Sequence, residues 1–252
     1  MTSSETHFSK AFAATDLCRD IETLFPELVT IRHTLHQHPE KGTQEFETDR
    51  IITGCLDAWG IPYRMIADTG ILASLTGEGS DPVGNTVGLR ADIDALPIEE
   101  DPSHACCSLN SGMMHACGHD AHTAMVLTLA EYAAEHLAEL PRNVLFLFQP
   151  SEETTGGAVK LCESGVLERY RVRRIFGLHL WPGLEAGTIA SRPGPLMARS
   201  NEVTVTVEGR SVHMSRADEG LDALTAGISY LQRAYDMLIH DVAIDKLHVV
   251  LG

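Results

Sequence analysis

The sequence predicts an α/β fold, in which a mostly parallel sheet is flanked by helices and is followed by part of a smaller α+β domain. Four short apolar runs are typical of buried strands: residues 70–76, 86–91, 143–149 and 174–180. A helical pattern from His119 to Leu137 separates the second run from the third, and a pattern over residues 156–168 separates the third from the fourth. Strands that alternate with helices indicate a largely parallel sheet.

Two further helices are predicted ahead of the first strand. Residues 16–37 carry apolar side chains at helical spacing, and we expect this helix to be interrupted or restarted near Pro26, because proline lacks the backbone N–H that a helix interior needs. A second helix is predicted from about Phe46 to Trp59, where Gly60 and Pro62 end it.

The pattern changes after Gly194, which indicates a second domain. Residues 201–209 alternate between apolar and polar side chains, as a half-buried strand does. A helix is predicted from about Asp218 to Ile239, and a second strand over residues 246–252. We therefore divide the chain into domains at 1–194 and 195–252, the second of them a β-α-β fragment.

Composition excludes several classes of protein. The 252 residues carry a formal net charge of −16 and contain no basic run, which argues against a nucleic-acid partner. The first residues lack a signal-peptide pattern, and no stretch reaches the roughly 20 apolar residues of a membrane helix. We therefore expect a soluble, cytoplasmic protein without a membrane partner. The six cysteines form no C-x-x-C pair, which excludes a thioredoxin-type redox centre.

The octapeptide HACGHDAH, residues 115–122, concentrates side chains that bind metal ions or protons. It contains His115, Cys117, His119, Asp120 and His122. A structural zinc site closes four ligands around the metal ion, commonly from paired cysteines or histidines, but Cys117 has no cysteine partner at that spacing. A catalytic metal site, which keeps a position open and has a carboxylate base beside it, is the better interpretation.

Further polar side chains follow the predicted strands. Asp92 and Asp94 end the second strand, Glu152 and Glu153 follow the third, and His179 ends the fourth. Taken singly, such residues are more often surface groups or turn caps. Ligands in open α/β sheets nevertheless gather at the carboxyl ends of strands, so we expect these residues to converge with the octapeptide on one site. Sequence motifs of serine hydrolases, P-loop proteins and dinucleotide-binding folds are absent.

Six motifs in this order resemble a known family from about Ile31 onward. They are RHTLHQHPEKGTQEFET, GLRADIDALPIEE, MMHACGHDAHTAMVL, FLFQPSEETTGGA, IFGLHLWPGLEAGTIASRPGPLMA and VEGRSVHMS. The chain resembles the metal-dependent amidohydrolases of the aminoacylase/carboxypeptidase superfamily, in the branch of hippurate hydrolases, auxin-conjugate hydrolases and N-acetyldiaminopimelate deacetylases. The resemblance implies a zinc-peptidase-like catalytic domain in residues 1–194 and a partial lid or dimerisation domain in residues 195–252.

The resemblance also implies a centre of two divalent metal ions. Cys117 and His119 would bind metal, with the thiolate as a bridge, and Glu153 and His179 would be further ligands. Glu152 would be the general base that deprotonates the metal-bound water and then protonates the leaving amine. The mixed ligand set admits zinc, manganese, cobalt or nickel.

Other residues are expected to support this centre. Asp92 resembles a residue that orients the ligands, as do Asp120 and His122. His213 resembles the lid histidine that reaches an active site, typically across a homodimer, and stabilises the oxyanion of the tetrahedral intermediate.

The expected reaction is hydrolysis of the amide bond of an N-acyl amino acid, a small-molecule substrate. Two alternatives stay open: an inactive or metal-binding remnant, and a related dipeptidase or carboxypeptidase. The remnant is an alternative because the family's sequences continue past the position of Gly252 to a final metal-binding histidine, so the resemblance implies a truncated chain with an incomplete second metal site.

Overall fold

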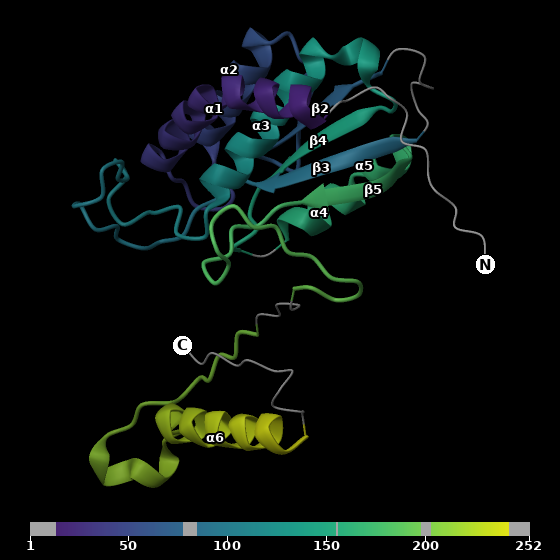
Figure 1. Ribbon diagram of the computed structural model, residues 1–252. Coiled ribbons are helices and arrows are strands. Elements are labelled where there is room, and N and C mark those ends of the chain that lie inside the picture. The colour runs from purple at the N-terminus through teal and green to yellow at the C-terminus, as the bar shows by residue number, and fades with distance from the viewer. Residues whose placement is uncertain (1–13, 78–84, 155, 198–202, 242–252) are drawn as a thin grey trace. The chain divides into compact units, whose positions relative to one another are not determined.

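The computed structural model describes residues 14–77, 85–154, 156–197 and 203–241 (Figure 1). The chain divides into two compact units, residues 1–190 and 191–252. The first unit contains the sheet and the second contains the longest helix of the C-terminal part, so each is described by itself.

The first unit is built on a five-stranded sheet with the order β1-β2-β4-β3-β5. The strands are β1 (Tyr63–Ile66), β2 (Gly70–Leu75), β3 (Thr86–Asp92), β4 (Val144–Gln149) and β5 (Val172–Gly177). β3 pairs in parallel with both β4 and β5, whereas β2 runs antiparallel to β1 and β4. The predicted α/β class is confirmed, and the sheet is mixed: its two parallel pairings involve β3, and its two antiparallel pairings involve β2.

Helices cover both faces of this sheet. They are α1 (Ala14–Gln37), α2 (Phe46–Ala58), α3 (His119–Glu135), α4 (Gly157–Glu163) and α5 (Val166–Arg169). α1, α2 and α3 lie on one face of the sheet, and α4 and α5 lie on the other (Figure 1). The first three share one buried apolar cluster with Phe146 and Phe148 of β4, and α4 and α5 share a second cluster with Leu145 and Leu147. β4 is therefore buried on both faces, which explains its uninterrupted apolar sequence.

Three details of the helices and strands differ from the sequence predictions. α1 runs through Pro26 without a break, because Pro26 is exposed and water can satisfy the carbonyl group that proline leaves without a partner. The helical pattern of residues 156–168 is split into α4 and α5 at Gly165, whose φ of +68° is left-handed. β1 was not predicted, because three of its four residues are exposed and give no apolar run.

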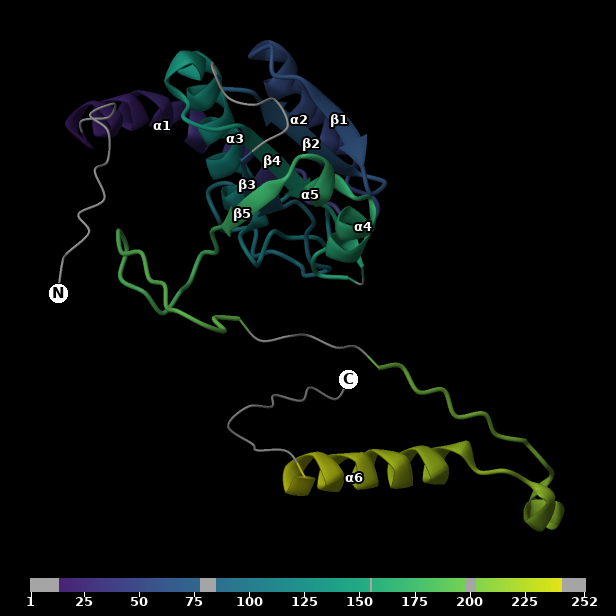
Figure 2. The ribbon, with the colours of Figure 1, turned by 90° about the vertical axis from the view of Figure 1, so that its right-hand side faces the viewer.

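In the second unit, α6 (Ala223–Asp241) is a single uninterrupted helix (Figure 2). It begins later than predicted, because Met214–Glu219 forms a separate 3-10 helix and Asp222 then caps α6 by accepting a hydrogen bond from the backbone N–H of Thr225. The predicted strand at residues 201–209 is wrong for its described part, because residues 203–209 form no strand. The next residue, Arg210, makes an isolated bridge to Leu221. The predicted strand at residues 246–252 lies outside the described residues. No helix in the described parts of the chain is long and apolar enough to cross a membrane.

Candidate metal centre

The candidate site lies at the carboxyl ends of β3 and β4, beside the first turn of α3. The two strands end level with each other, since Asp92 is paired with Gln149. Gly118 precedes α3 with a φ of +89°, and a Cβ atom at this position would lie 2.9 Å from Cδ1 of Leu180. The left-handed backbone conformation favours a glycine here, and a larger residue would also have to displace the terminal methyl of Leu180 in the segment that follows β5.

Seven of the polar residues predicted from the sequence meet in this region. Among the described residues they form three overlapping groups whose possible ligand atoms lie within 4.8 Å of one another: Cys117, His119 and His179; Asp92, His119 and His122; and His119, Glu152 and Glu153. His119 is common to all three groups, so it lies at the centre of the cluster.

His119 presents one ring nitrogen to three carboxylates. Its side chain is 1% exposed, and Nδ1 donates a hydrogen bond to the carbonyl oxygen of Asp94 at 2.8 Å. Nε2 makes no hydrogen bond to the described residues. It lies 3.6 Å from Asp92 Oδ2, 3.7 Å from Glu153 Oε1 and 3.8 Å from Glu152 Oε2. An imidazole with one nitrogen bonded to the backbone and the other free is the arrangement of a metal-ligating histidine.

The electrostatics around His119 favour a cation. Burial acts to lower the pKa of His119, but the hydrogen bond to Asp94 and the charge of Asp92 outweigh burial and raise it. The carboxylates therefore favour positive charge at the position that Nε2 faces. A divalent metal ion fits this donor set, because it accepts nitrogen and carboxylate ligands together.

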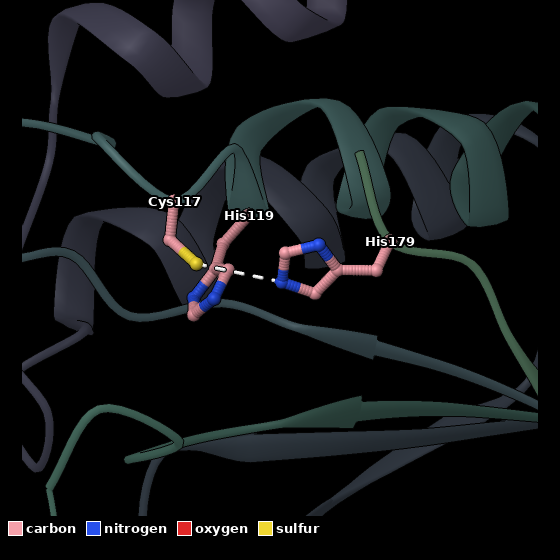
Figure 3. Close-up of side chains that lie close together, drawn as sticks. All are labelled: Cys117, His119 and His179. Atoms are coloured by element: carbon pink, nitrogen blue, oxygen red, sulfur yellow. Dashed lines mark hydrogen bonds between the residues drawn. The ribbon is translucent and has the colours of Figure 1, made fainter. Parts of the chain in front are cut away.

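Cys117 and His179 face each other at the edge of the same cluster (Figure 3). Cys117 Sγ lies 3.4 Å from His179 Nε2, and His179 Nδ1 donates a hydrogen bond to the carbonyl oxygen of Leu180. Burial, followed by the charge of Glu153, raises the pKa of the Cys117 thiol to about 12. This thiol becomes a thiolate at neutral pH only if a metal ion or another positive charge binds it.

Asp92 and His122 form a bonded layer behind His119. His122 Nδ1 donates to Asp92 Oδ1 at 2.7 Å, and His122 Nε2 accepts the backbone N–H of Leu180 at 2.9 Å. Arg90 donates to the second oxygen of Asp92. Burial acts to raise the pKa of Asp92, but His122, His119 and Arg90 hold it well below its usual range. Asp92 is therefore a fixed negative charge beside the cluster.

Asp120 and His115, in contrast, stand outside the cluster. Asp120 Oδ2 accepts a hydrogen bond from Nδ1 of His36 and forms an ion pair with Nε of Arg32 at 2.8 Å, and both partners lie in α1. His115 is buried, and burial lowers its pKa to about 4. Neither residue belongs to a group of possible ligands among the described residues.

The turn that carries Glu152 and Glu153 depends on Asp94, which the sequence places near the site without a role, and on Glu45, which it does not place there. Asp94 accepts the backbone N–H groups of Glu152 and Glu153, and Glu45 accepts that of Ser151. Asp94 had a signal, since it lies two positions after Asp92 at the same strand end. Glu45 had none, because it lies 106 residues before the backbone group that it binds.

His213 lies in the second unit, where its side chain is exposed. Its Nδ1 lies 2.8 Å from Ser215 Oγ and accepts the backbone N–H of Ser215. It therefore caps the short helix Met214–Glu219.

Comparisons with known proteins agree on one family. The model of Peptidase family M20/M25/M40 matches residues 88–243. The chain is 41% identical over 206 residues to an N-acetyl-L-cysteine deacetylase of Bacillus subtilis, covering 81% of this chain and 48% of the relative. It is 42% identical over 206 residues to an IAA-amino acid hydrolase of Arabidopsis thaliana, covering 81% and 46%. The chain thus spans about half the length of the curated relatives that it matches.

A solved structure supports the same assignment. A dinuclear metal-binding M20 peptidase of Bacillus subtilis matches with a TM-score of 0.65 at 41% identity, covering 70% of this chain and 49% of that one. These findings confirm the resemblance that the motifs indicated. Since the family model extends over residues 88–243 of the 252, the chain belongs to Peptidase family M20/M25/M40.

Proposed function

We propose that this protein hydrolyses the amide bond of N-acyl amino acids with the help of two divalent metal ions. The observation that carries the proposal is Nε2 of His119: it is buried, it makes no hydrogen bond to the described residues, and it faces the carboxylates of Asp92, Glu152 and Glu153. Such a nitrogen is costly to bury without a ligand. A metal ion removes that cost and gives the surrounding carboxylates a counter-charge.

The ligands that we assign are Cys117, His119, Glu153 and His179. Sulfur, imidazole and carboxylate donors together suit zinc, manganese, cobalt or nickel. When bound, such ions polarise a substrate carbonyl and lower the pKa of a coordinated water. His122 links Asp92 to the backbone N–H of Leu180. Because Leu180 follows His179 in the chain, this link helps to fix the position of the His179 imidazole.

We assign Glu152 as the general base. Its side chain is 41% exposed, against 20% for Glu153, and its Oε2 lies 3.8 Å from His119 Nε2. Glu152 can therefore reach both a substrate and the cluster, while the more buried Glu153 serves as a ligand. In the reaction Glu152 takes a proton from the attacking water and delivers it to the nitrogen of the leaving amino acid.

We further propose that residues 195–252 belong to a lid and dimerisation domain. In this proposal His213 of one copy stabilises the oxyanion that forms in the site of a second copy. The support is the resemblance of its motif, since His213 is exposed and its Nε2 makes no contact that fixes it elsewhere in the described residues.

The substrate class is supported by the names of two relatives. One is a deacetylase of N-acetyl-L-cysteine and the other is a hydrolase of IAA-amino acids. Both names specify an acylated amino acid, so we propose an N-acyl amino acid for this protein as well.

A substrate panel tests the proposal. The metal-loaded protein is incubated with N-acetyl and N-benzoyl amino acids and, in parallel, with dipeptides, and the released amino acid is quantified. We expect release from the acylated amino acids. Release from dipeptides alone would replace the proposal with a dipeptidase. No release from either class, with at most one metal ion bound per chain, would indicate a non-catalytic metal-binding protein.

A further inference from the structure

The turn after β4 carries the two glutamates, and buried carboxylates hold this turn in place. It begins at Ser151, whose φ of +52° lies in the left-handed region that residues other than glycine seldom adopt. The backbone N–H groups of three consecutive residues, Ser151, Glu152 and Glu153, donate to carboxylate oxygens at 2.8, 2.9 and 2.9 Å. Consecutive N–H groups of this kind form a concave binding site for negative charge.

Asp94 supplies two of those three acceptors. Oδ1 accepts from Glu152 and Oδ2 accepts from Glu153, and the residue is 0% exposed. Both oxygens are thus used by the backbone, which leaves Asp94 poorly suited to bind a metal ion itself.

Asp94 also fixes His119. Its carbonyl oxygen accepts the hydrogen bond from His119 Nδ1 at 2.8 Å, and its Oδ1 lies 3.4 Å from the same nitrogen. One residue therefore sets the position of the imidazole and of both glutamates, although these groups come from α3 and from the turn after β4.

The segment before α2 closes this arrangement from the other side. The backbone N–H of Ala95 donates to the carbonyl oxygen of Glu40 at 2.8 Å. A Cβ atom at Gly42 would lie 2.6 Å from Oγ1 of Thr154, in the same turn, 3.0 Å from Cα of Ser151 and 3.1 Å from Oδ2 of Asp94. There is no space at Gly42 for a side chain unless the turn or the Asp94 carboxylate moves.

We propose that Asp94 is a positioning residue that sets the distances between His119, Glu152 and Glu153 and so tunes the affinity of the metal site. The proposal rests on the proposed function, because it concerns the same cluster. Residues that orient metal ligands typically change metal affinity by about 10- to 100-fold when they are replaced.

The test is the binding of cobalt chloride to Asp94→Asn, followed by calorimetry and by the absorption spectrum of the cobalt-loaded chain. Asparagine has the same size but only one acceptor oxygen, so its amide N–H₂ would face one of the two glutamate N–H groups. We expect the cobalt dissociation constant to rise by about 10- to 100-fold and the thiolate-to-cobalt band of Cys117 to change in intensity. Where the wild-type chain hydrolyses substrate, kcat of the variant should fall by roughly 10²-fold, while its KM stays within about threefold of the wild-type value.

Asp101→Asn is the matched control. Asp101 lies in an exposed loop, where its Oδ1 accepts the backbone N–H of Ser103 at 2.9 Å. The variant makes the same chemical change to the same kind of hydrogen bond outside the site, so cobalt binding should stay at the wild-type value.

A second variant keeps the proposal testable if Asp94→Asn does not fold, as judged by circular dichroism. Gly42→Ala retains every polar group and displaces the turn or the Asp94 carboxylate by its Cβ atom, so it should also weaken cobalt binding. The proposal would be overturned if folded Asp94→Asn bound cobalt with wild-type affinity and an unchanged spectrum. If Asp94→Asn is unfolded, the same result in Gly42→Ala would overturn it. Either result would leave the proposed function intact. Cobalt binding without hydrolysis by the wild-type chain would overturn the function and leave Asp94 under test. A wild-type chain that binds no cobalt would overturn both.

Discussion

At the scale of single residues, hydrogen bonds decide which nitrogen of each histidine is available. Nδ1 of His119 and of His179 is bonded to a backbone carbonyl, which turns Nε2 toward the cluster. Nε2 of His119 has no hydrogen-bond partner among the described residues, and Nε2 of His179 faces Sγ of Cys117 at 3.4 Å. Both nitrogens of His122 are bonded instead, to Asp92 and to the backbone of Leu180. Three histidines that are equivalent in the sequence thus separate into two candidate ligands and one supporting residue.

The role of Glu152 leads to a prediction about catalysis. Glu152→Gln keeps the shape of the side chain and removes its ability to accept a proton, so hydrolysis should fall by a factor of about 10² or more. Metal content, measured by elemental analysis, should be unchanged because Glu153 is the assigned ligand. Glu163→Gln, at an exposed position of α4, is the control. Turnover retained in Glu152→Gln would remove Glu152 from its role.

Asp49 leads to a prediction about stability and pH. Burial, with the nearby charges of Glu45 and Glu40, raises the pKa of Asp49 from 3.8 to about 8. The folded chain therefore retains this proton at pH values where the unfolded chain has lost it. It follows that the free energy of unfolding decreases as the pH rises from about 4 through about 8.

Asp49→Asn should remove this contribution, because the amide is neutral at every pH. We expect its thermal midpoint to exceed that of the wild type at pH 8, with a smaller difference at pH 5. Asp57→Asn, at an exposed position of the same helix, should show no such difference. If the difference in thermal midpoint between the wild type and Asp49→Asn is the same at pH 5 and pH 8, the buried carboxyl does not titrate as described.

At the scale of helices and strands, the sequence predicts best what is buried on both sides. β4 was predicted because Phe146 and Leu147 point to opposite apolar clusters. β1 was missed because it is exposed, and Gly165 divides a helical pattern whose spacing alone gave no sign of a break. The ligand types at the strand ends were predictable, whereas the bonds from Glu45 and Asp94 to the glutamate turn depend on contacts between distant segments.

The contact between α1 and α3 leads to a further prediction. His36 lies between two buried carboxylates, with Nδ1 bonded to Asp120 and Nε2 to Glu100. The hydrogen bond to Asp120 raises the pKa of His36 against the opposing effect of burial. His36→Ala would remove one partner from each carboxylate, while Arg32 still pairs with Asp120 and His104 with Glu100. The free energy of unfolding should therefore fall by about 1–3 kcal/mol.

Urea denaturation at pH 6 and pH 8 measures this effect. Because the pKa of His36 is raised, its stabilising contribution is complete below the ordinary value and is lost as the pH rises through the raised value. The loss in His36→Ala should therefore be larger at pH 6. His33→Ala, at an exposed position of the same helix, is the control, and equal stability of the two variants would contradict the role given to His36.

At the scale of the whole molecule, the cluster joins segments from most of the first unit. Its members come from the end of β3, the start of α3, the turn after β4 and the segment after β5. The order of these segments could be predicted from the α/β pattern, because the carboxyl ends of parallel strands share one edge. The second unit was predicted less well, since its expected strand at residues 201–209 has no ladder partner in its described part.

We propose, as the central claim, that the cluster around His119 binds the metal ions on which hydrolysis of N-acyl amino acids depends. The most direct test is the initial rate of hydrolysis of an N-acetyl amino acid as metal ions are added to the chelator-treated protein. We predict no hydrolysis without metal, and a rate that rises with added metal and saturates at no more than two ions per chain. Hydrolysis that persists unchanged after chelation, or no hydrolysis at any metal concentration, would contradict the claim.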